Sequence, residues 1–400
     1  MALKVKIMKG LALFGAMMLV YYTTITIMAT YLYATGRVRG SPLWEMVNNF
    51  RGEGYEEELM VLEKAPEEPA GELPSLVVKV EETSTGRENI KVQEKITSSP
   101  SSPLLVLLLS SMPRGGSTLL TEMLSTKERS ITFFEPLWPL QKKKCIEDEQ
   151  CVTQYLADVF ACNYNPDFER WLKTKDLFLS YFSSDAKECT RITDQKAKEL
   201  CLKKLNLREM CLLSPIRIIK VIRARMAWMK NLLSNNSLDL KIIHLIRDPR
   251  GSLYSISKFK DWNKDPHERC LGLQEDLQSF DQLSQEFPTK LLQVKYENLS
   301  LHPHNVSKDI LQFLYGDGNL PEYLVTYIST HMTNNSESHS MSTTKESKKQ
   351  YEAWRFKMPQ KMLKAVQDEP TCLYSIKYMQ HTLFKDQKHA RNSSISLFVS

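Results

Sequence analysis

The chain has 400 residues, of which 42% are hydrophobic and 25% are charged, with a formal net charge of +6. This composition excludes a collagen-like chain, a wholly disordered chain and a small disulfide-bonded scaffold. The length is enough for one large domain or two modest ones.

The charge is divided unevenly along the chain. Residues 1–39 contain five Lys or Arg and no acid, and residues 40–103 contain thirteen Glu against six Lys or Arg. Residues 104–400 therefore keep 42 Lys or Arg against 34 Asp or Glu. A mildly basic domain suits an anionic ligand, but this excess falls short of the concentrated basic stripe of a nucleic-acid-binding protein.

The first predicted element is a transmembrane signal-anchor helix over residues 11–33. No charged residue lies between Gly10 and Gly36, and the apolar run is long enough, at about 1.5 Å per residue, to cross a ~30 Å hydrocarbon core. The flanking lysines and arginines favour a cytoplasmic tail at residues 1–10 and a lumenal location for the rest. A cleaved signal peptide is the alternative, although its apolar region is normally only about 7–15 residues long.

Residues 34–103 are predicted to form an acidic stem that contains Pro and Ser and is too polar and self-repelling to pack a core. From residue 104 to residue 384 we expect one lumenal domain, followed by a C-terminal tail at 385–400. Within the domain, short apolar runs typical of buried strands alternate with helical patterns. This alternation predicts an α/β fold with a P-loop-like, mainly parallel sheet flanked by helices. The predicted strands are 104–109, 216–222, 240–246 and 291–294, and the predicted helices include 152–160, 224–233, 273–287, 306–314 and 351–366.

All eight cysteines lie beyond residue 140, in the part predicted to be lumenal. An even number of cysteines in an oxidising compartment predicts disulfide bonds, whose pairing the sequence does not reveal. A metal site is not expected, because the chain has no Cys-x-x-Cys pair and no close Cys/His cluster. Sequons for N-glycosylation agree with passage through the secretory route. They begin at Asn235, Asn298, Asn305, Asn334 and Asn392.

The first predicted strand leads into a glycine-containing turn and then into a helical pattern. The turn and helix start read Pro113, Arg114, Gly115, Gly116, Ser117, Thr118 and Leu119. This order directs free backbone N–H groups and the positive end of a helix dipole at an anion. Arg114 can donate two hydrogen bonds to phosphate or sulfate oxygens. A nucleoside-triphosphate P-loop is one alternative, although Ser117 replaces its lysine, and an ordinary capped turn is another.

A second motif follows the strand at 240–246 and contains Arg247, Asp248, Pro249, Arg250 and, later, Ser255. Ligands of open α/β sheets bind outside the carboxyl ends of the strands. Arg247 and Ser255 are therefore predicted to bind a second phosphate. Asp248 and Pro249 also suit the cap and the first residue of a helix, and surface positions for the two arginines are the alternative.

Together these motifs resemble the Golgi membrane sulfotransferases that use 3′-phosphoadenylyl sulfate, and within them the branch that sulfates the 6-hydroxyl of Gal, GalNAc or GlcNAc. The Arg114 turn is similar to the family's 5′-phosphosulfate loop, except that Gly115 stands where the family usually has Ser. The segment from Phe134 to Leu137 matches its Phe-Glu-Pro-Leu motif, and the Arg247 motif is similar to its 3′-phosphate loop. Further similarities lie at Cys162 to Pro166, Lys220 with Arg223, Tyr296-Glu297 and Trp354-Arg355.

The resemblance implies an enzyme that transfers a sulfuryl group from 3′-phosphoadenylyl sulfate, its co-substrate, to a glycan or glycosaminoglycan hydroxyl, with no metal and no nucleic acid. It implies Glu135 as the catalytic base, and Arg114 is the second predicted catalytic residue; a helix-capping or salt-bridged glutamate is the alternative for Glu135. Lys220 and Arg223 are predicted to steer the anionic donor or acceptor, and a solvated strand end is the alternative for them. The resemblance also implies a single-pass type II protein of the Golgi membrane. The donor-binding residues would be Pro113, Arg114, Gly115, Gly116, Ser117, Thr118, Leu119, Arg247, Asp248, Pro249, Arg250 and Ser255. The alternatives are a protein-tyrosine sulfotransferase and a catalytically silent glycan-binding protein of the same fold.

Overall fold

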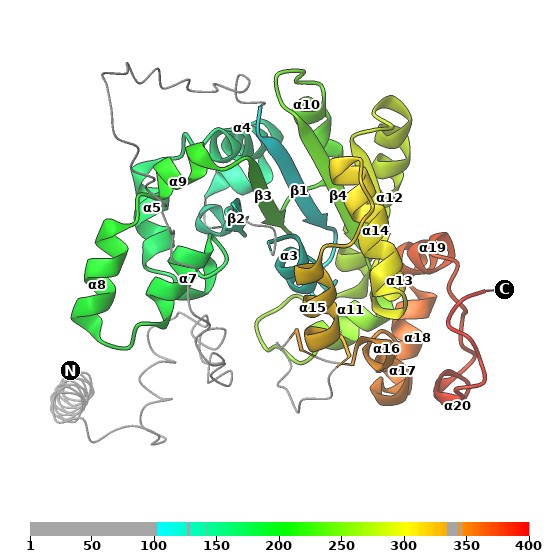
Figure 1. Ribbon diagram of the computed structural model, residues 1–400. Helices are drawn as coiled ribbons and strands as arrows, with labels where there is room; N and C mark the ends of the chain where they lie inside the picture. The colour runs from blue at the N-terminus through cyan, green and yellow to red at the C-terminus, as the bar shows by residue number, and fades with distance from the viewer. Residues whose placement is uncertain (1–101, 126–128, 142, 334–342, 345, 400) are drawn as a thin grey trace, which may run out of the picture. The chain divides into compact units, whose positions relative to one another are not determined.

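A computed structural model describes residues 102–125, 129–141, 143–333, 343–344 and 346–399 (Figure 1). The predicted cytoplasmic tail, the predicted transmembrane helix and all but the last two residues of the predicted stem lie outside these ranges. Among the helices in the described ranges, none has the length and apolar character needed to cross a membrane.

Five parallel strands form one sheet in the order β2-β3-β1-β4-β5 (Figure 1). The expected α/β fold with a parallel sheet is confirmed, and four strands lie where the apolar runs place them. Sequence analysis missed β2, a short edge strand that lies only a few residues after the first helix. The strands are β1 (Leu104–Ser110), β2 (Ser130–Phe134), β3 (Ile216–Val221), β4 (Leu240–Ile246) and β5 (Leu291–Lys295).

The central strand β1 buries both of its faces, because successive side chains of a strand point to opposite sides of the sheet. Leu105, Leu107 and Leu109 pack in one apolar cluster with the helices between β2 and β3. Val106 and Leu108 pack in a second cluster, with α3 (Ser117–Ser125), α14 (Pro303–Tyr315) and α15 (Glu322–His331). The continuous apolar run of β1 is thus explained by helices on both faces.

Most predicted helices are present with shifted ends. The helix predicted at 273–287 begins earlier, at Pro266, because Asp265 caps it and Pro suits its first position. The helix predicted at 351–366 is divided at Pro359, which has no N–H to continue the first segment.

The described chain between β2 and β3 contains η2 (Trp138–Leu140), η3 (Lys144–Glu147), α4 (Glu149–Phe160), α5 (Pro166–Lys173), α6 (Asp176–Leu179), α7 (Ser184–Arg191), α8 (Gln195–Lys204) and α9 (Leu207–Leu213). After β3 come η4 (Met226–Trp228) and α10 (Met229–Leu233), which replace the single helix predicted at 224–233. The other helices are α11 (Pro249–Ile256), α12 (Pro266–Glu286), α13 (Tyr296–Leu301), α16 (Ser347–Gln350), α17 (Trp354–Lys357), α18 (Gln360–Asp368), α19 (Pro370–Tyr378) and α20 (Gln387–Arg391).

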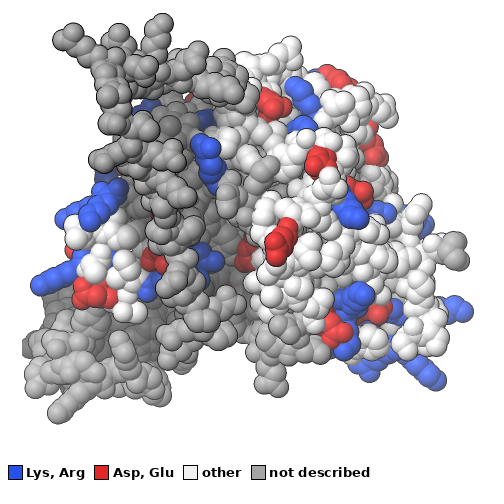
Figure 2. All heavy atoms as spheres, in the orientation of Figure 1, with Lys and Arg blue, Asp and Glu red and all other residues white. Residues whose placement is uncertain are grey.

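Charged side chains of both signs are interspersed on the described surface that Figure 2 shows. On this face the described Lys and Arg do not gather into a long basic stripe (Figure 2).

All eight cysteines are paired, which confirms the expectation of disulfide bonds. The pairs are Cys145–Cys151, Cys162–Cys211, Cys189–Cys201 and Cys270–Cys372.

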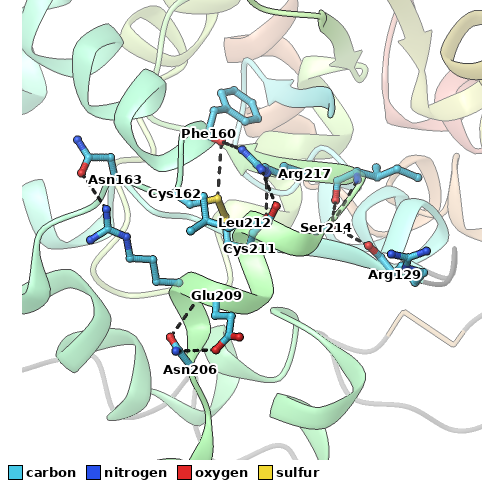
Figure 3. The surroundings of a disulfide bond; sticks show 12 residues. Arg129, Phe160, Cys162, Asn163, Asn206, Glu209, Cys211, Leu212, Ser214 and Arg217 are labelled. Atoms are coloured by element: carbon cyan, nitrogen blue, oxygen red, sulfur yellow. Dashed lines mark hydrogen bonds between the residues drawn. A yellow bond between two sulfur atoms is a disulfide. The ribbon is translucent and has the colours of Figure 1, made fainter. Parts of the chain in front are cut away.

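The Cys162–Cys211 bond joins the end of α4 to α9 directly over Arg217 of β3 (Figure 3). The buried Arg217 guanidinium donates to the carbonyl oxygens of Phe160 at 2.7 Å and Cys211 at 3.0 Å (Figure 3). Both carbonyls lie at helix ends, and the Cys211 carbonyl also accepts from the Ser214 N–H at 3.2 Å. The disulfide thus links two parts of the chain between β2 and β3, and Arg217 hydrogen-bonds both parts to the sheet.

The segment predicted as a C-terminal tail packs onto the domain. Arg355, which is 1% exposed, donates to the carbonyl oxygens of Ala390 at 2.8 Å and Asn392 at 3.0 Å. Leu397 is 1% exposed, and His381 forms an antiparallel bridge with Phe398. The domain therefore extends past the predicted boundary at residue 384 and includes residues up to 399.

Candidate active site

The turn after β1 forms a cradle of backbone N–H groups. Arg114, with φ 61°, and Gly116, with φ 94°, reverse the chain before α3 begins. Gly116 also permits close packing, because a Cβ at this position would overlap the ring of Tyr296. Within the described residues, the N–H groups from Gly115 to Leu119 donate to no acceptor. The turn therefore offers the donors that an anion at a helix N-terminus needs.

The two predicted phosphate-binding motifs contact each other. Arg114 Nε donates to Ser255 Oγ at 3.2 Å, and Arg247 Nη1 donates to the Arg114 carbonyl oxygen at 2.7 Å. The Arg247 guanidinium lies 4.1 Å from the centroid of the Tyr296 ring. Its Nε is buried and donates to no acceptor in the described part of the chain. Motifs that are more than 130 residues apart in sequence thus form one site at the carboxyl ends of β1 and β4.

Asp248 and Arg250, expected at the donor, are instead fully buried. Arg250 donates to Asp248 Oδ2 at 2.7 Å, to Gln367 Oε1 at 2.9 Å and to the Thr382 carbonyl oxygen at 2.8 Å. Burial alone would raise the pKa of Asp248, but Arg250 and His381 hold it well below its usual range. The carboxylate also accepts from the Arg250 N–H at 2.9 Å and so caps α11. These two side chains therefore support the Arg247 motif from inside the domain.

Pro249 and Leu119, two other predicted donor-binding residues, are also buried. Pro249 is buried as the first residue of α11, and the Leu119 side chain packs in the apolar cluster that contains α3. Ser117 is 5% exposed, whereas Thr118 is partly exposed beside it. Of the predicted donor-binding side chains, Arg114, Thr118, Arg247 and Ser255 are the ones that remain partly exposed.

Glu135 lies at the carboxyl end of β2 with its side chain between two cations. Its carboxylate pairs with Lys220 and, at 2.6 Å, with Arg223 Nη1. Glu135 has φ 52°, an unusual conformation for this residue type, and its N–H donates to the Lys220 carbonyl oxygen at 2.9 Å. The ends of β2 and β3 thus hold a carboxylate whose side chain is 4% exposed, on the side of the sheet where the strands end and the Arg114 turn begins.

A buried polar group beneath the turn was missed in the sequence. Ser111 Oγ lies 2.6 Å from His244 Nε2. Burial lowers the pKa of His244 to about 3 and keeps its ring neutral. Burial also raises the pKa of Asp276, on α12, to about 6, although Arg225, the Met226 N–H and Ser111 oppose this effect. The available signal was a single histidine within the apolar run of β4.

Comparisons with known proteins show which proteins this chain is similar to. A model described as the sulfotransferase family matches residues 107–316. The chain is similar to carbohydrate sulfotransferase 3 of Rattus norvegicus, with 28% identity over 205 residues, which cover 45% of this chain and 42% of the relative. The protein of the same name from Tetronarce californica is 26% identical over 235 residues, which cover 54% of this chain and 51% of the relative. The chain thus spans about half the length of the curated relatives it matches.

Among solved structures, the sulfotransferase domain of a Synechococcus olefin synthase gives a TM-score of 0.36 at 18% identity, and the match covers 64% of this chain and 88% of that domain. Within the described residues there is no group of three or more His, Cys, Asp or Glu placed to hold a metal ion. The family model extends from β1 to the end of α14 and includes both loops of the site. Because it matches more than half of the chain, we conclude that this protein belongs to the sulfotransferase family.

Proposed function

We propose that this protein transfers a sulfuryl group from 3′-phosphoadenylyl sulfate to the 6-hydroxyl of Gal, GalNAc or GlcNAc in a glycan or glycosaminoglycan. The contact between the Arg114 turn and the Arg247 motif is the observation that carries the proposal. It brings two anion sites together, as a donor with a 5′-phosphosulfate and a 3′-phosphate requires. A carbohydrate acceptor is supported by the relatives named carbohydrate sulfotransferase 3.

In this proposal the 5′-phosphosulfate lies on the backbone N–H groups of the Arg114 turn, and Arg114 neutralises it. Arg247 and Ser255 hold the 3′-phosphate and select this donor over nucleotides that lack it. The buried and unpartnered Arg247 Nε supports the assignment, because a buried donor without an acceptor is costly unless a ligand completes it. Asp248, Pro249 and Arg250 position this loop and do not contact the donor.

Glu135 is the proposed base. Its ionised carboxylate takes the proton of the acceptor hydroxyl while the hydroxyl oxygen forms its bond to sulfur. The bond between sulfur and the bridging oxygen breaks, and its electron pair goes to the leaving phosphate. Arg114 and the N–H groups of the turn stabilise that charge, as expected for a loose transfer in which positioning and electrostatics dominate. Lys220 and Arg223 orient the Glu135 carboxylate through their ion pairs.

We further propose that the domain lies in the Golgi lumen behind a single transmembrane helix at residues 11–33. Four disulfide bonds support an oxidising compartment. The sequon asparagines within the described residues, Asn235, Asn298, Asn305 and Asn392, are all exposed, which supports glycosylation.

The test is transfer of labelled sulfate by the full chain onto chondroitin, keratan-type and N-glycan acceptors and onto a tyrosine peptide. We expect incorporation into at least one glycan at the 6-hydroxyl and none into the peptide. Incorporation into the peptide alone would identify a tyrosine sulfotransferase. Binding of adenosine 3′,5′-bisphosphate without transfer to any acceptor would indicate a silent glycan-binding protein.

A further inference from the structure

A cleft of about 100 Å³ lies beside the turn after β1. Three arginines line it: Arg223, Arg225 and Arg269. Ser111, Pro113, Ile222, Ala224 and Glu268 complete the lining. We call this space the arginine cleft. It is bounded by the turn, the segment after β3 and the first turn of α12.

The cleft is built by close packing around Arg225. A Cβ at Gly272 of α12 would overlap the Arg225 guanidinium. Because glycine has no side chain, Arg225 has room to lie across the helix. Arg225 Nη1 lies 3.6 Å from Asp276 Oδ2, beneath the cleft. The side chain of Arg225 nevertheless keeps 40% of its surface exposed. The guanidinium is therefore held in position and remains accessible.

Two of the three arginines of the cleft, Arg225 and Arg269, have N–H donors without an acceptor among the described residues. Arg269 donates from Nε to the Asn263 carbonyl oxygen at 2.9 Å, and neither its Nη groups nor any N–H of Arg225 forms a hydrogen bond within the described residues. Burial lowers the pKa of Arg269, and although Glu268 opposes this, the nearby Arg225 and Arg223 add to it. Such crowding of like charges is relieved by a bound anion. Guanidinium groups also match the geometry of carboxylate and sulfate oxygens.

The arginine cleft adjoins the start of the turn, at Ser111 and Pro113. Pro113 was expected among the donor-binding residues, but it has no N–H for the donor, and the donor contacts proposed above begin at Arg114. Arg223 connects the cleft with the proposed base, because it lines the cleft and its Nη1 pairs with Glu135 at 2.6 Å. An acceptor whose hydroxyl reaches Glu135 therefore places a neighbouring sugar near the cleft.

We propose that the arginine cleft binds an acidic group of the acceptor, a carboxylate or a sulfate ester on a sugar next to the one that receives the sulfuryl group. Arg225 and Arg269 supply the hydrogen bonds, and Arg223 links this subsite to Glu135. The proposal rests on the proposed function and adds the chemical class of the acceptor. It predicts a preference for acidic glycans over neutral glycans of the same backbone.

The experiment compares the wild type with Arg225→Gln, Arg269→Gln and the double variant. The acceptors are chondroitin with its carboxyl-reduced form, and keratan sulfate with its desulfated form. We expect the double variant to raise the KM for one or both acidic acceptors by about 10-fold or more, as for loss of charged hydrogen bonds. The KM for the neutral partner and the KM for the donor should stay unchanged. A raised KM for chondroitin would show that the cleft binds a carboxylate. A raised KM for keratan sulfate would show that it binds a sulfate ester.

Lys230→Gln is the matched control, because Lys230 is an exposed cation on α10 that pairs with Glu286 outside the cleft. Equal KM changes for acidic and neutral acceptors, or no change for either acidic acceptor, would overturn the proposal. Arg269→Gln keeps the test valid if Arg225→Gln fails to fold, because Arg269 makes a single contact with an exposed loop. If the wild type transfers no sulfate, the proposed function fails. Direct binding of acidic and carboxyl-reduced oligosaccharides, with adenosine 3′,5′-bisphosphate present, then decides whether the cleft selects acidic glycans.

Discussion

Replacing Arg250 with Met should lower the free energy of unfolding of the domain. It should leave the contacts with the sulfuryl donor in place. Arg250 is fully buried, and its guanidinium lies 4.8 Å from the ring centroid of Trp354 and 5.1 Å from that of Phe384. Methionine keeps much of this packing but leaves the Asp248 carboxylate buried without its strongest partner. Breaking a buried ion pair in this way costs about 3–5 kcal/mol. That is a large part of the ~5–15 kcal/mol that stabilises a typical domain.

The assay is denaturant unfolding of the wild type, Arg250→Met and a double variant that adds Asp248→Asn. The double variant should recover part of the loss, because it no longer buries an unpaired charge. Since the folded pKa of Asp248 is lowered, its stabilisation is present above the ordinary carboxyl value of 3.8 and is lost as the pH falls through the lower folded pKa. The difference in the free energy of unfolding between the wild type and Arg250→Met should therefore become smaller in acid.

Binding of adenosine 3′,5′-bisphosphate distinguishes support of the loop from contact with the donor. Under conditions where the Arg250→Met variant is still folded, its affinity should lie within about threefold of the wild type, well below the loss expected for a direct charged hydrogen bond. A variant with wild-type unfolding free energy and a tenfold or greater loss of affinity would refute the reasoning. Such a result would indicate that Arg250 contacts the donor, as the sequence predicts.

Four further changes test other parts of the molecule. Glu135→Gln should lower turnover by about 10²-fold or more and leave donor binding intact, as for loss of a general base; near-normal kcat would remove Glu135 from the mechanism. Arg247→Ala should weaken binding of adenosine 3′,5′-bisphosphate by about 10-fold to 100-fold, the loss expected for charged hydrogen bonds; calorimetry showing unchanged affinity would contradict this. Gly115→Ser should destabilise the turn by about 1–3 kcal/mol because its Cβ would lie 2.6 Å from Ser110 Oγ; adding Ser110→Ala should restore the unfolding midpoint. Arg217→Met should cost about 1–3 kcal/mol because the buried Phe160 carbonyl loses the Arg217 donor; a wild-type unfolding curve would contradict this.

The fold was predictable to the extent that burial leaves a periodic signal. The strands β1, β3, β4 and β5 are apolar runs because helices cover both faces of the sheet. The edge strand β2 gave no such run, although Phe133 and Phe134 are buried there. The packing of the last residues was also missed, since it depends on Arg355 reaching carbonyl oxygens more than thirty positions away. Long-range contacts of this kind leave no local pattern.

The candidate site was predictable where residue chemistry and strand ends coincide. The turn at Arg114 and the pair Arg247 and Ser255 follow strands that are neighbours in the sheet, so their contact depends only on the topology. The ion pairs of Glu135 with Lys220 and Arg223 required the register of β2 against β3, which the sequence does not show. The arginine cleft was missed because Arg269 comes from α12, more than forty residues after Arg223.

The two arginines of the second motif differ because a helix begins between them. Arg247 precedes Asp248, whose non-helical backbone and capping carboxylate start α11, so Arg247 continues from β4 toward the Arg114 turn. Arg250 lies within the first turn of α11 and is directed inward to Asp248 and Gln367. The buried pair therefore determines where α11 begins, and α11 carries Ser255 to Arg114. The buried pair of Asp248 and Arg250 is thus connected through α11 to the proposed 3′-phosphate site, and a change in the pair should alter this proposed site only by moving that helix.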